Sequence, residues 1–315
     1  MKTIHSLLLK IFKTQQISLC TFLSEAQRIV ELTHVMKRYR TEANYLTALH
    51  ALQNFATDKQ CASEPLTSEL MYNFQRWLLI NDKSLNTVSA YARALRAIYN
   101  KVYPDGPPLF GKMFTGTLTT RKRAITAEEL YRLRMLELTE NNWLRLSRDI
   151  FLFSFYCMGM PFIDLAMLRW TQIKGTHLVY ARHKTGQRIE IALLPEAKEI
   201  IDRWSTAQSK YVFPFLKEDN EQALYQQYAS ALAQYNRALR QLGALIHAEA
   251  PLSSYTSRHT WASLAYQHNV DLNIISQAMG HHNSRTTRIY IQEINAVNVA
   301  NANRQLWHSI FDSAQ

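Results

Sequence analysis

The segment Met279-Gly280-His281-His282-Asn283-Ser284-Arg285-Thr286-Thr287-Arg288-Ile289-Tyr290 carries a tyrosine nine positions after its first histidine, and the pair Arg258-His259 precedes it in the chain. These residue types together suit chemistry on a phosphodiester. Arginine presents paired donors to phosphate oxygens, histidine donates or accepts a proton, and a phenol can become covalently joined to phosphorus. The ordered set is therefore the most informative feature of the sequence.

Each member of this set also has an ordinary structural explanation. Arg258 could form a surface ion pair, and His281 could be a buried structural histidine. The chain has 16 tyrosines, so Tyr290 stands out only through its spacing from His281. The combination of all three residues in this order favours a phosphate-directed function.

The composition also favours a polyanionic partner. The chain of 315 residues has 36 lysines and arginines against 25 acidic residues, which gives a net charge of +11. Such an excess favours nucleic acid through the release of counterions. The length allows two domains, and a hydrophobic fraction of 47% argues against disorder.

Neither a membrane segment nor a metal site is expected. No apolar stretch approaches the length of a membrane span, and Leu7-Leu8-Leu9 is too short for a signal peptide core. We therefore expect a cytoplasmic protein without a membrane partner. Cys20, Cys61 and Cys157 lack metal-ligand spacing and are expected to be reduced structural thiols. We predict neither a metal nor a cofactor.

Helical periodicity extends from Ser18 to about Tyr103. Its last helix follows Ser84 or Asn86, either of which could be the N-cap. One apolar stripe of this helix consists of Val88, Tyr91, Leu95 and Ile98. Three basic residues flank the stripe, and we expect them to bind nucleic acid, with a solvated helix face as the ordinary alternative: Arg93, Arg96 and Lys101.

A break in the pattern separates two predicted domains. Pro104-Asp105-Gly106-Pro107-Pro108 ends the last helix, and a new helix begins after Thr126 as its N-cap. We predict a helical domain at residues 1–110, a linker at 111–123 and a second domain at 124–315. The end of the linker adds three basic residues that we expect to contact nucleic acid: Arg121, Lys122 and Arg123.

The second domain is predicted to be mostly helical with one small sheet. Residues 177–181 and 188–193 alternate between apolar and polar side chains, and Lys184-Thr185-Gly186 lies between them, which predicts a β-hairpin. The fold class is therefore mainly α with a small antiparallel β-sheet. The helices expected in this domain cover residues 147–158, 221–242, 258–268, 272–279 and 295–311, with a shorter one through Asp164 and Leu168.

In this order, the segments resemble those of tyrosine recombinases of the phage integrase family, over nearly the whole chain. The resemblance implies a SAM-like helical core-binding domain followed by a mixed α/β catalytic domain. The matching segments are Asn86–Tyr99, Ile125–Leu130, Gly159–Trp170, Lys184–Gly186, Arg258–Thr260 and Met279–Tyr290.

The resemblance also implies roles for individual residues. Tyr290 would form a 3′-phosphotyrosyl bond and free a 5′-hydroxyl, so that the energy of the broken phosphodiester is retained without ATP. Arg258 would bind the scissile phosphate. His281 would hydrogen-bond a phosphate oxygen or assist proton transfer, and Lys184 would protonate the leaving oxygen. Two further residues would support the site: His259 and Asp164.

The sequence departs from the family pattern at two positions. Tyr255 occupies the place of a histidine in the H-x-x-R box, where its hydroxyl can still donate a hydrogen bond. Pro161 occupies the place of the first phosphate-binding arginine and offers no donor. Our hypothesis is that Arg182 or Arg188 from the neighbouring hairpin supplies the missing charge.

The implied function is site-specific recombination of double-stranded DNA, in integration, excision or inversion. The expected partners are inverted-repeat DNA sites, occupied by a homotetramer that is a monomer when free. A weaker similarity suggests a Bacteroides-type integrase or invertase, a bacterial protein associated with the nucleoid. Fewer than twenty residues precede the first expected helix, so we expect no large additional N-terminal domain. The alternatives are a catalytically silent DNA-binding protein and a type IB topoisomerase without site preference.

Overall fold

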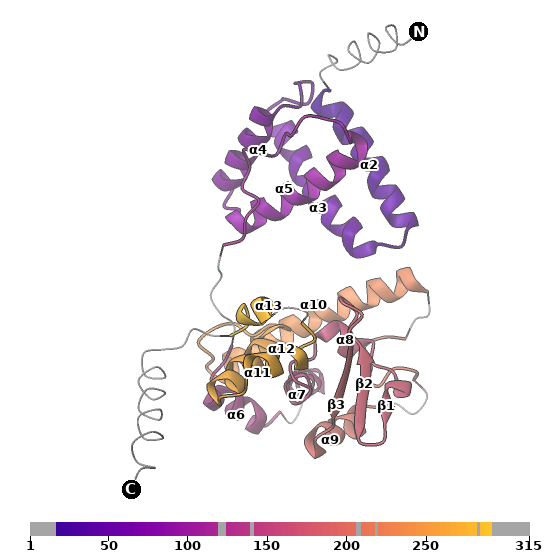
Figure 1. Ribbon diagram of the computed structural model, residues 1–315, viewed down its shortest axis with the longest axis vertical. Coiled ribbons are helices and arrows are strands. Elements are labelled where there is room, and N and C mark those ends of the chain that lie inside the picture. Colours follow the sequence, from indigo (N-terminus) through magenta and orange to yellow (C-terminus); the bar gives the residue numbers. More distant parts are fainter. Residues whose placement is uncertain are drawn as a thin grey trace. The chain divides into compact units, whose positions relative to one another are not determined.

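The computed structural model describes residues 17–118, 124–138, 142–205, 209–217, 220–281 and 284–291. The chain forms two compact units, one up to Thr120 and one from Arg121, which are shown in Figure 1 and described separately here. The described elements are mostly helices with one three-stranded antiparallel sheet, so the predicted fold class is confirmed. Among these elements, no helix has the length and apolar character needed to cross a membrane.

The first unit is built from four described helices, three of which start at a serine or threonine cap. Ser18 Oγ accepts the backbone N–H of Thr21 at 3.1 Å, and Ser84 Oγ accepts that of Thr87 at 3.2 Å. The apolar faces of the helices meet in one core. The helices are α2 (Leu19–Val35), α3 (Tyr39–Asp58), α4 (Ser68–Ile80) and α5 (Leu85–Val102).

Ser84 is the N-cap of α5, and Asn86 has a different role. The Asn86 side chain pairs with the backbone of Leu118, donating at 3.1 Å and accepting at 2.8 Å. Ser89 Oγ donates to the carbonyl of Gly116 at 2.6 Å. The described part of the predicted linker, residues 111–118, therefore packs against the helix that precedes it.

The apolar stripe of α5 faces the core of the first unit. Val88, Leu95 and Ile98 are fully buried, and Tyr91 is partly buried. The basic residues predicted to bind nucleic acid are exposed on the same helix: Arg93, Arg96 and Lys101. The predicted basic residues Arg121, Lys122 and Arg123 lie outside the described residues.

The second unit begins with α6 (Ala127–Met135), whose N-cap is Thr126 as expected, and Thr126 forms a capping box with Glu129. The long apolar helix α7 (Asn142–Tyr156) and the short helix α8 (Phe162–Ala166) follow. Both pack in one hydrophobic core with the sheet and with apolar residues from the segments 197–201 and 231–242. This core holds the two ends of the α7–α8 turn in place.

The sheet contains the predicted hairpin and one additional strand. β2 (His177–Ala181) pairs with β3 (Arg188–Ala192), with Ala181 opposite Arg188. The additional strand, β1 (Ile173–Lys174), follows the 3-10 helix η1 (Trp170–Gln172) and pairs with β2. Two residues are too few for an alternating pattern, so the sequence did not reveal β1.

Five further helices complete the described part of the second unit (Figure 1). Three were predicted with slightly different ends, which is usual because terminal turns fray. The predicted helix at residues 295–311 lies outside the described residues. The five are α9 (Pro195–Trp204), α10 (Glu221–Leu245), α11 (Thr256–Gln267), α12 (Leu272–Ala278) and α13 (Ser284–Arg288).

Candidate active site

The turn after α7 presents a backbone carbonyl to the site. Gly159 has a positive φ of 72°, and its N–H donates to the carbonyl of Ser154 at 2.8 Å. Ser154 Oγ also donates to the carbonyl of Met160 at 2.7 Å. A Cβ on Gly159 would lie 2.8 Å from the Cα of Arg258. Only glycine therefore allows this turn to pack so closely on α11.

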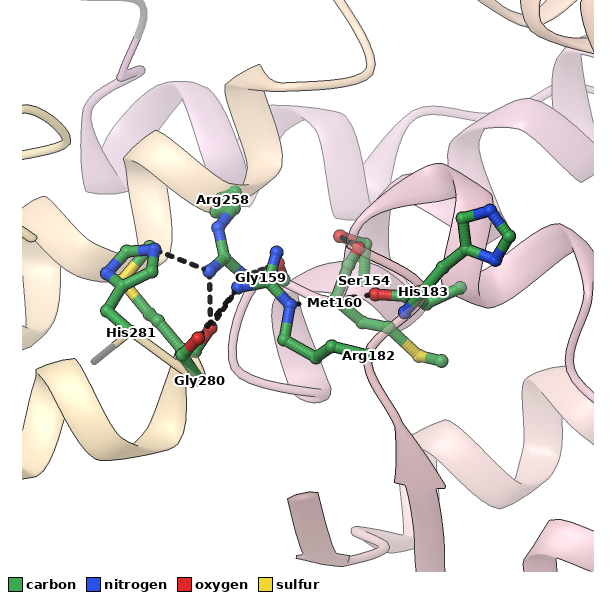
Figure 2. A network of polar contacts seen from close by, with 10 residues as sticks. Ser154, Gly159, Met160, Arg182, His183, Arg258, Gly280 and His281 are labelled. Carbon is green, nitrogen blue, oxygen red and sulfur yellow. Dashed lines mark hydrogen bonds and ion pairs between the residues drawn. The ribbon is translucent and has the colours of Figure 1, made fainter. Parts of the chain in front are cut away.

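Arg258 is the central side chain of the site, and it is only 2% exposed. Its Nη1 donates to the carbonyl of Gly159 at 2.7 Å, and its Nη2 donates to Met279 and to His281 Nε2, the latter at 3.0 Å (Figure 2). Burial, followed by the charge of Arg182, lowers the pKa of Arg258 to about 10. The guanidinium is still charged at neutral pH.

Arg182 lies beside Arg258 and is 7% exposed. Its Nη1 donates to the carbonyls of Met279 at 2.8 Å and Gly280 at 3.1 Å, so the two arginines share the Met279 carbonyl (Figure 2). A Cβ on Gly280 would lie 2.5 Å from Arg182 Cδ. Arg188, in contrast, is exposed and lies 3.7 Å from Glu190. The structure thus brings Arg182 into the site and leaves Arg188 outside it.

Asp164 is the buried carboxylate nearest to this arginine pair. Its Oδ1 accepts the backbone N–H of His183 at 2.8 Å, and its Oδ2 lies 3.8 Å from Arg182 Nε. Burial raises the pKa of Asp164, while the His183 N–H and the charge of Arg182 oppose that rise. One carboxylate therefore faces two buried guanidinium groups, and the surplus positive charge suits an anion.

His281 follows α12 and is held on both sides. Its Nε2 faces Arg258, and its Nδ1 lies 3.0 Å from Thr287 Oγ1. Burial, then the positive charges of Arg258, Arg182 and Lys184, lowers the pKa of His281 to about 4. The ring is therefore neutral near pH 7. Lys184 itself is exposed in the turn between β2 and β3.

Tyr290 packs on this cluster. Its ring stacks on that of His281, with centroids 5.2 Å apart, and the Cζ of Arg258 lies 5.3 Å from the ring centre. The His259 ring lies 4.7 Å away on a tilt, and its Nδ1 is 3.3 Å from the Tyr290 carbonyl oxygen. The three residues of the ordered set predicted from sequence therefore meet in space.

The two positions that depart from the family pattern contribute less. Pro161 is the buried N-cap of α8 and makes no side-chain capping bond. Tyr255 precedes α11, and its side chain is 52% exposed, outside the buried cluster. Sequence reasoning missed Ser154 and Thr287. Ser154 could have been found as a small polar residue within an apolar helix. Thr287 could have been found from its position between His281 and Tyr290.

The described residues contain no cluster of three or more His, Cys, Asp or Glu side chains that could hold a metal ion. The cysteines are free thiols, with Cys20 exposed and Cys61 and Cys157 buried. Burial raises the pKa of the Cys157 thiol, which makes it a poor nucleophile.

Comparisons with known proteins agree with this geometry. The family model described as the phage integrase family matches residues 124–296, and the phage integrase SAM-like domain matches residues 21–106. A search of curated protein sequences found no match.

Solved structures share the fold at low sequence identity. A lambda integrase dimer bound to a COC' core site is 16% identical, with a TM-score of 0.65 over 92% of this chain and 84% of that one. XerH recombinase bound to palindromic difH substrate is 13% identical, with a TM-score of 0.64 over 92% and 97%. The Tn1549 transposon integrase with transposon right end DNA is 13% identical, with a TM-score of 0.57 over 92% and 99%.

The family model covers more than half of the chain, including every residue of the cluster around Arg258. The same region supplies the arginine, histidine and tyrosine in the order that the family's chemistry requires. The chain belongs to the phage integrase family and is a tyrosine recombinase.

Proposed function

We propose that this protein breaks and rejoins DNA strands at specific inverted-repeat sites, with Tyr290 as the nucleophile. The observation that carries the proposal is the stacking of the Tyr290 ring on His281, with the Arg258 guanidinium 5.3 Å from the ring centre. The buried positive charge of Arg258 would attract the scissile phosphate towards this phenol.

In the proposed reaction, the phenol of Tyr290 gives its proton to water, and a bond forms between its oxygen and phosphorus. The bond between phosphorus and the 5′-oxygen breaks, and Lys184 gives that oxygen a proton. Reversal by the 5′-hydroxyl of another strand rejoins the DNA. Because transesterification conserves the phosphodiester energy, the reaction needs neither ATP nor a hydrolysing water.

Arg258 and Arg182 would together stabilise the extra negative charge of the pentacoordinate phosphate. Arg182 would thus supply the charge that Pro161 lacks, and its sharing of the Met279 carbonyl with Arg258 supports this role. Asp164 would orient Arg182, and His281 would hydrogen-bond a non-bridging oxygen. Two further residues have supporting roles in this proposal: His259 against Tyr290, and Tyr255 as a hydrogen-bond donor.

The DNA-binding surface would include the exposed basic residues of α5 together with the basic end of the linker: Arg93, Arg96, Lys101, Arg121, Lys122 and Arg123. We propose that the protein is a cytoplasmic monomer that assembles into a homotetramer on paired sites. Integration, excision and inversion all fit this chemistry. The proposed source is a mobile element of a Bacteroides-type bacterium.

The test is the formation of a covalent protein–DNA adduct on a nicked duplex that carries the inverted repeats beside the gene. We expect an adduct with the wild-type protein and none with Tyr290→Phe, while DNA binding in a gel shift is retained. Tyr131→Phe is the matched control because this tyrosine is 62% exposed and lies on α6. Binding without any wild-type adduct would instead identify a catalytically silent DNA-binding protein. Relaxation of plasmids that lack the repeats would identify a topoisomerase.

A further inference from the structure

Thr287 on α13 is joined to both His281 and Tyr290. Its side chain is fully buried, and its Oγ1 lies 3.0 Å from His281 Nδ1. Its carbonyl accepts the backbone N–H of Tyr290 at 2.9 Å. The neighbouring Thr286 is exposed. One buried hydroxyl therefore touches the ring that would bind the phosphate, and the same residue anchors the nucleophile.

The hydrogen bonds around His281 define its tautomer in the free protein. The guanidinium of Arg258 can only donate, so His281 Nε2, at 3.0 Å from Arg258 Nη2, must accept. The ring is neutral near pH 7, since its pKa is lowered to about 4. Its single proton is therefore on Nδ1 and is donated to Thr287 Oγ1.

The Nδ1–H tautomer of His281 cannot donate a hydrogen bond from Nε2 to a bound phosphate. Phosphate oxygens only accept hydrogen bonds, so Nε2 must carry a proton if His281 is to hold one of them. Protonating the whole ring is unfavourable, because the ring is buried and lies among positively charged groups. The charged and titratable groups around the ring are Arg258 and His259 on α11, Arg182 and Lys184 after β2, and Tyr290 after α13.

We infer that Thr287 is a positioning residue whose hydroxyl lets neutral His281 exchange its Nδ1–H tautomer for the Nε2–H tautomer when phosphate binds. Water takes the proton from Nδ1 and a second water molecule supplies the proton at Nε2, so both the charge of the ring and the number of protons are unchanged. A threonine hydroxyl both accepts and donates, so it pairs with Nδ1 in either state. The inference rests on the proposed function, because it assigns His281 to a phosphate oxygen.

Thr287→Val removes the hydroxyl at nearly constant shape, while Thr287→Ser keeps it. We expect Thr287→Val to slow adduct formation on the nicked inverted-repeat duplex by about 10- to 100-fold, the usual range for partners that orient a reacting group. The valine leaves Nδ1 without a partner in either tautomer, so the exchange loses its support. Thr287→Ser should restore the rate, and Thr286→Val should match wild type. A Thr287→Val protein with the wild-type rate, or a Thr287→Ser protein as slow as Thr287→Val, would overturn the inference.

A second measurement works without DNA. Nitrogen-15 NMR of the histidine rings in the free full-length protein, assigned with His281→Gln, should show the Nδ1–H tautomer of His281 at neutral pH. An Nε2–H tautomer or an imidazolium in the free protein would contradict the inference even if Thr287→Val folds poorly. Absence of any wild-type adduct would count against the proposed function, whereas the NMR result bears on Thr287 and His281 alone.

Discussion

In the described part of the second unit, buried charge gathers around Asp149 and around Arg258, and the two clusters differ in how that charge is paired. Asp149 accepts from Arg148 Nε at 2.9 Å, Arg203 Nη1 at 2.7 Å and Trp204 Nε1 at 2.8 Å. The side chain of Arg203 is 42% exposed, so its charge reaches water. The buried carboxylate of this cluster therefore has a full set of donors, which suits a structural role.

Around Arg258 the positive charge is in excess and remains buried. Arg258 and Arg182 face a single carboxylate, Asp164, and within the described part of the chain the Nε atoms of both arginines have no hydrogen-bond partner. Burying like charges together costs free energy. Such a cost is typical of a functional site, where a ligand of opposite charge relieves it. The charge around Asp149 is paired within the protein, which suits a role in stability. The excess of positive charge around Arg258 instead suits the binding of an anion.

The largest expected effect is on catalysis, at Arg182. Arg182→Met should slow adduct formation by about 10²- to 10³-fold, as for the loss of one preorganised donor to a transition state. Its effect on the free energy of unfolding should be small, because lost hydrogen bonds are offset by relief of repulsion with Arg258. Adduct formation on the nicked duplex and urea unfolding measure the two effects.

Arg188→Met is the control for this prediction, because Arg188 is exposed and should be dispensable for cleavage. A double variant that combines Arg182→Met with Pro161→Arg tests whether Arg182 replaces the arginine that is missing at Pro161. Partial recovery of the rate in the double variant is expected. Equal rates for Arg182→Met and Arg188→Met would refute the assignment.

Asp149→Asn should instead lower the stability of the protein and leave DNA cleavage unaffected. Removing the charge leaves buried donors without their partner, and we expect a loss of about 3 kcal/mol in the free energy of unfolding. The cleavage rate of the folded fraction should be unchanged. Glu190→Gln is the exposed counterpart and should cost less than about 1 kcal/mol. If Asp149→Asn impaired cleavage in folded protein, the separation of the two clusters would be wrong.

A smaller effect is expected at Gly280, whose φ is +64°. Gly280→Ala adds a Cβ against Arg182 Cδ, whereas Gly175→Ala, at a φ of +61°, meets no atom within 4 Å. Both should cost about 1 kcal/mol from the left-handed backbone, and only Gly280→Ala should also slow cleavage by moving Arg182. Thermal unfolding and adduct formation compare the pair. Identical behaviour of the two variants would mean that Arg182 tolerates displacement.

Local patterns predicted much of the fold. The cap Thr126 and the stripe containing Val88 and Leu95 follow from rules that act within a few residues. The hairpin followed from alternation, whereas β1 is too short to show any. Sequence alone suggested two caps for α5, and only the packing of residues 111–118 explains why Asn86 is used elsewhere.

By itself, the sequence determined the helical periodicity, the excess of positive charge and the chemical types of Arg258, His281 and Tyr290 in their order. Only the tertiary structure decided between Arg182 and Arg188 and revealed Thr287 as the partner of His281. The physical reason is that Arg182 is fixed by carbonyls 97 and 98 positions away in the chain. Local propensity cannot encode such a contact, because it depends on how the hairpin and the end of α12 pack together around a glycine.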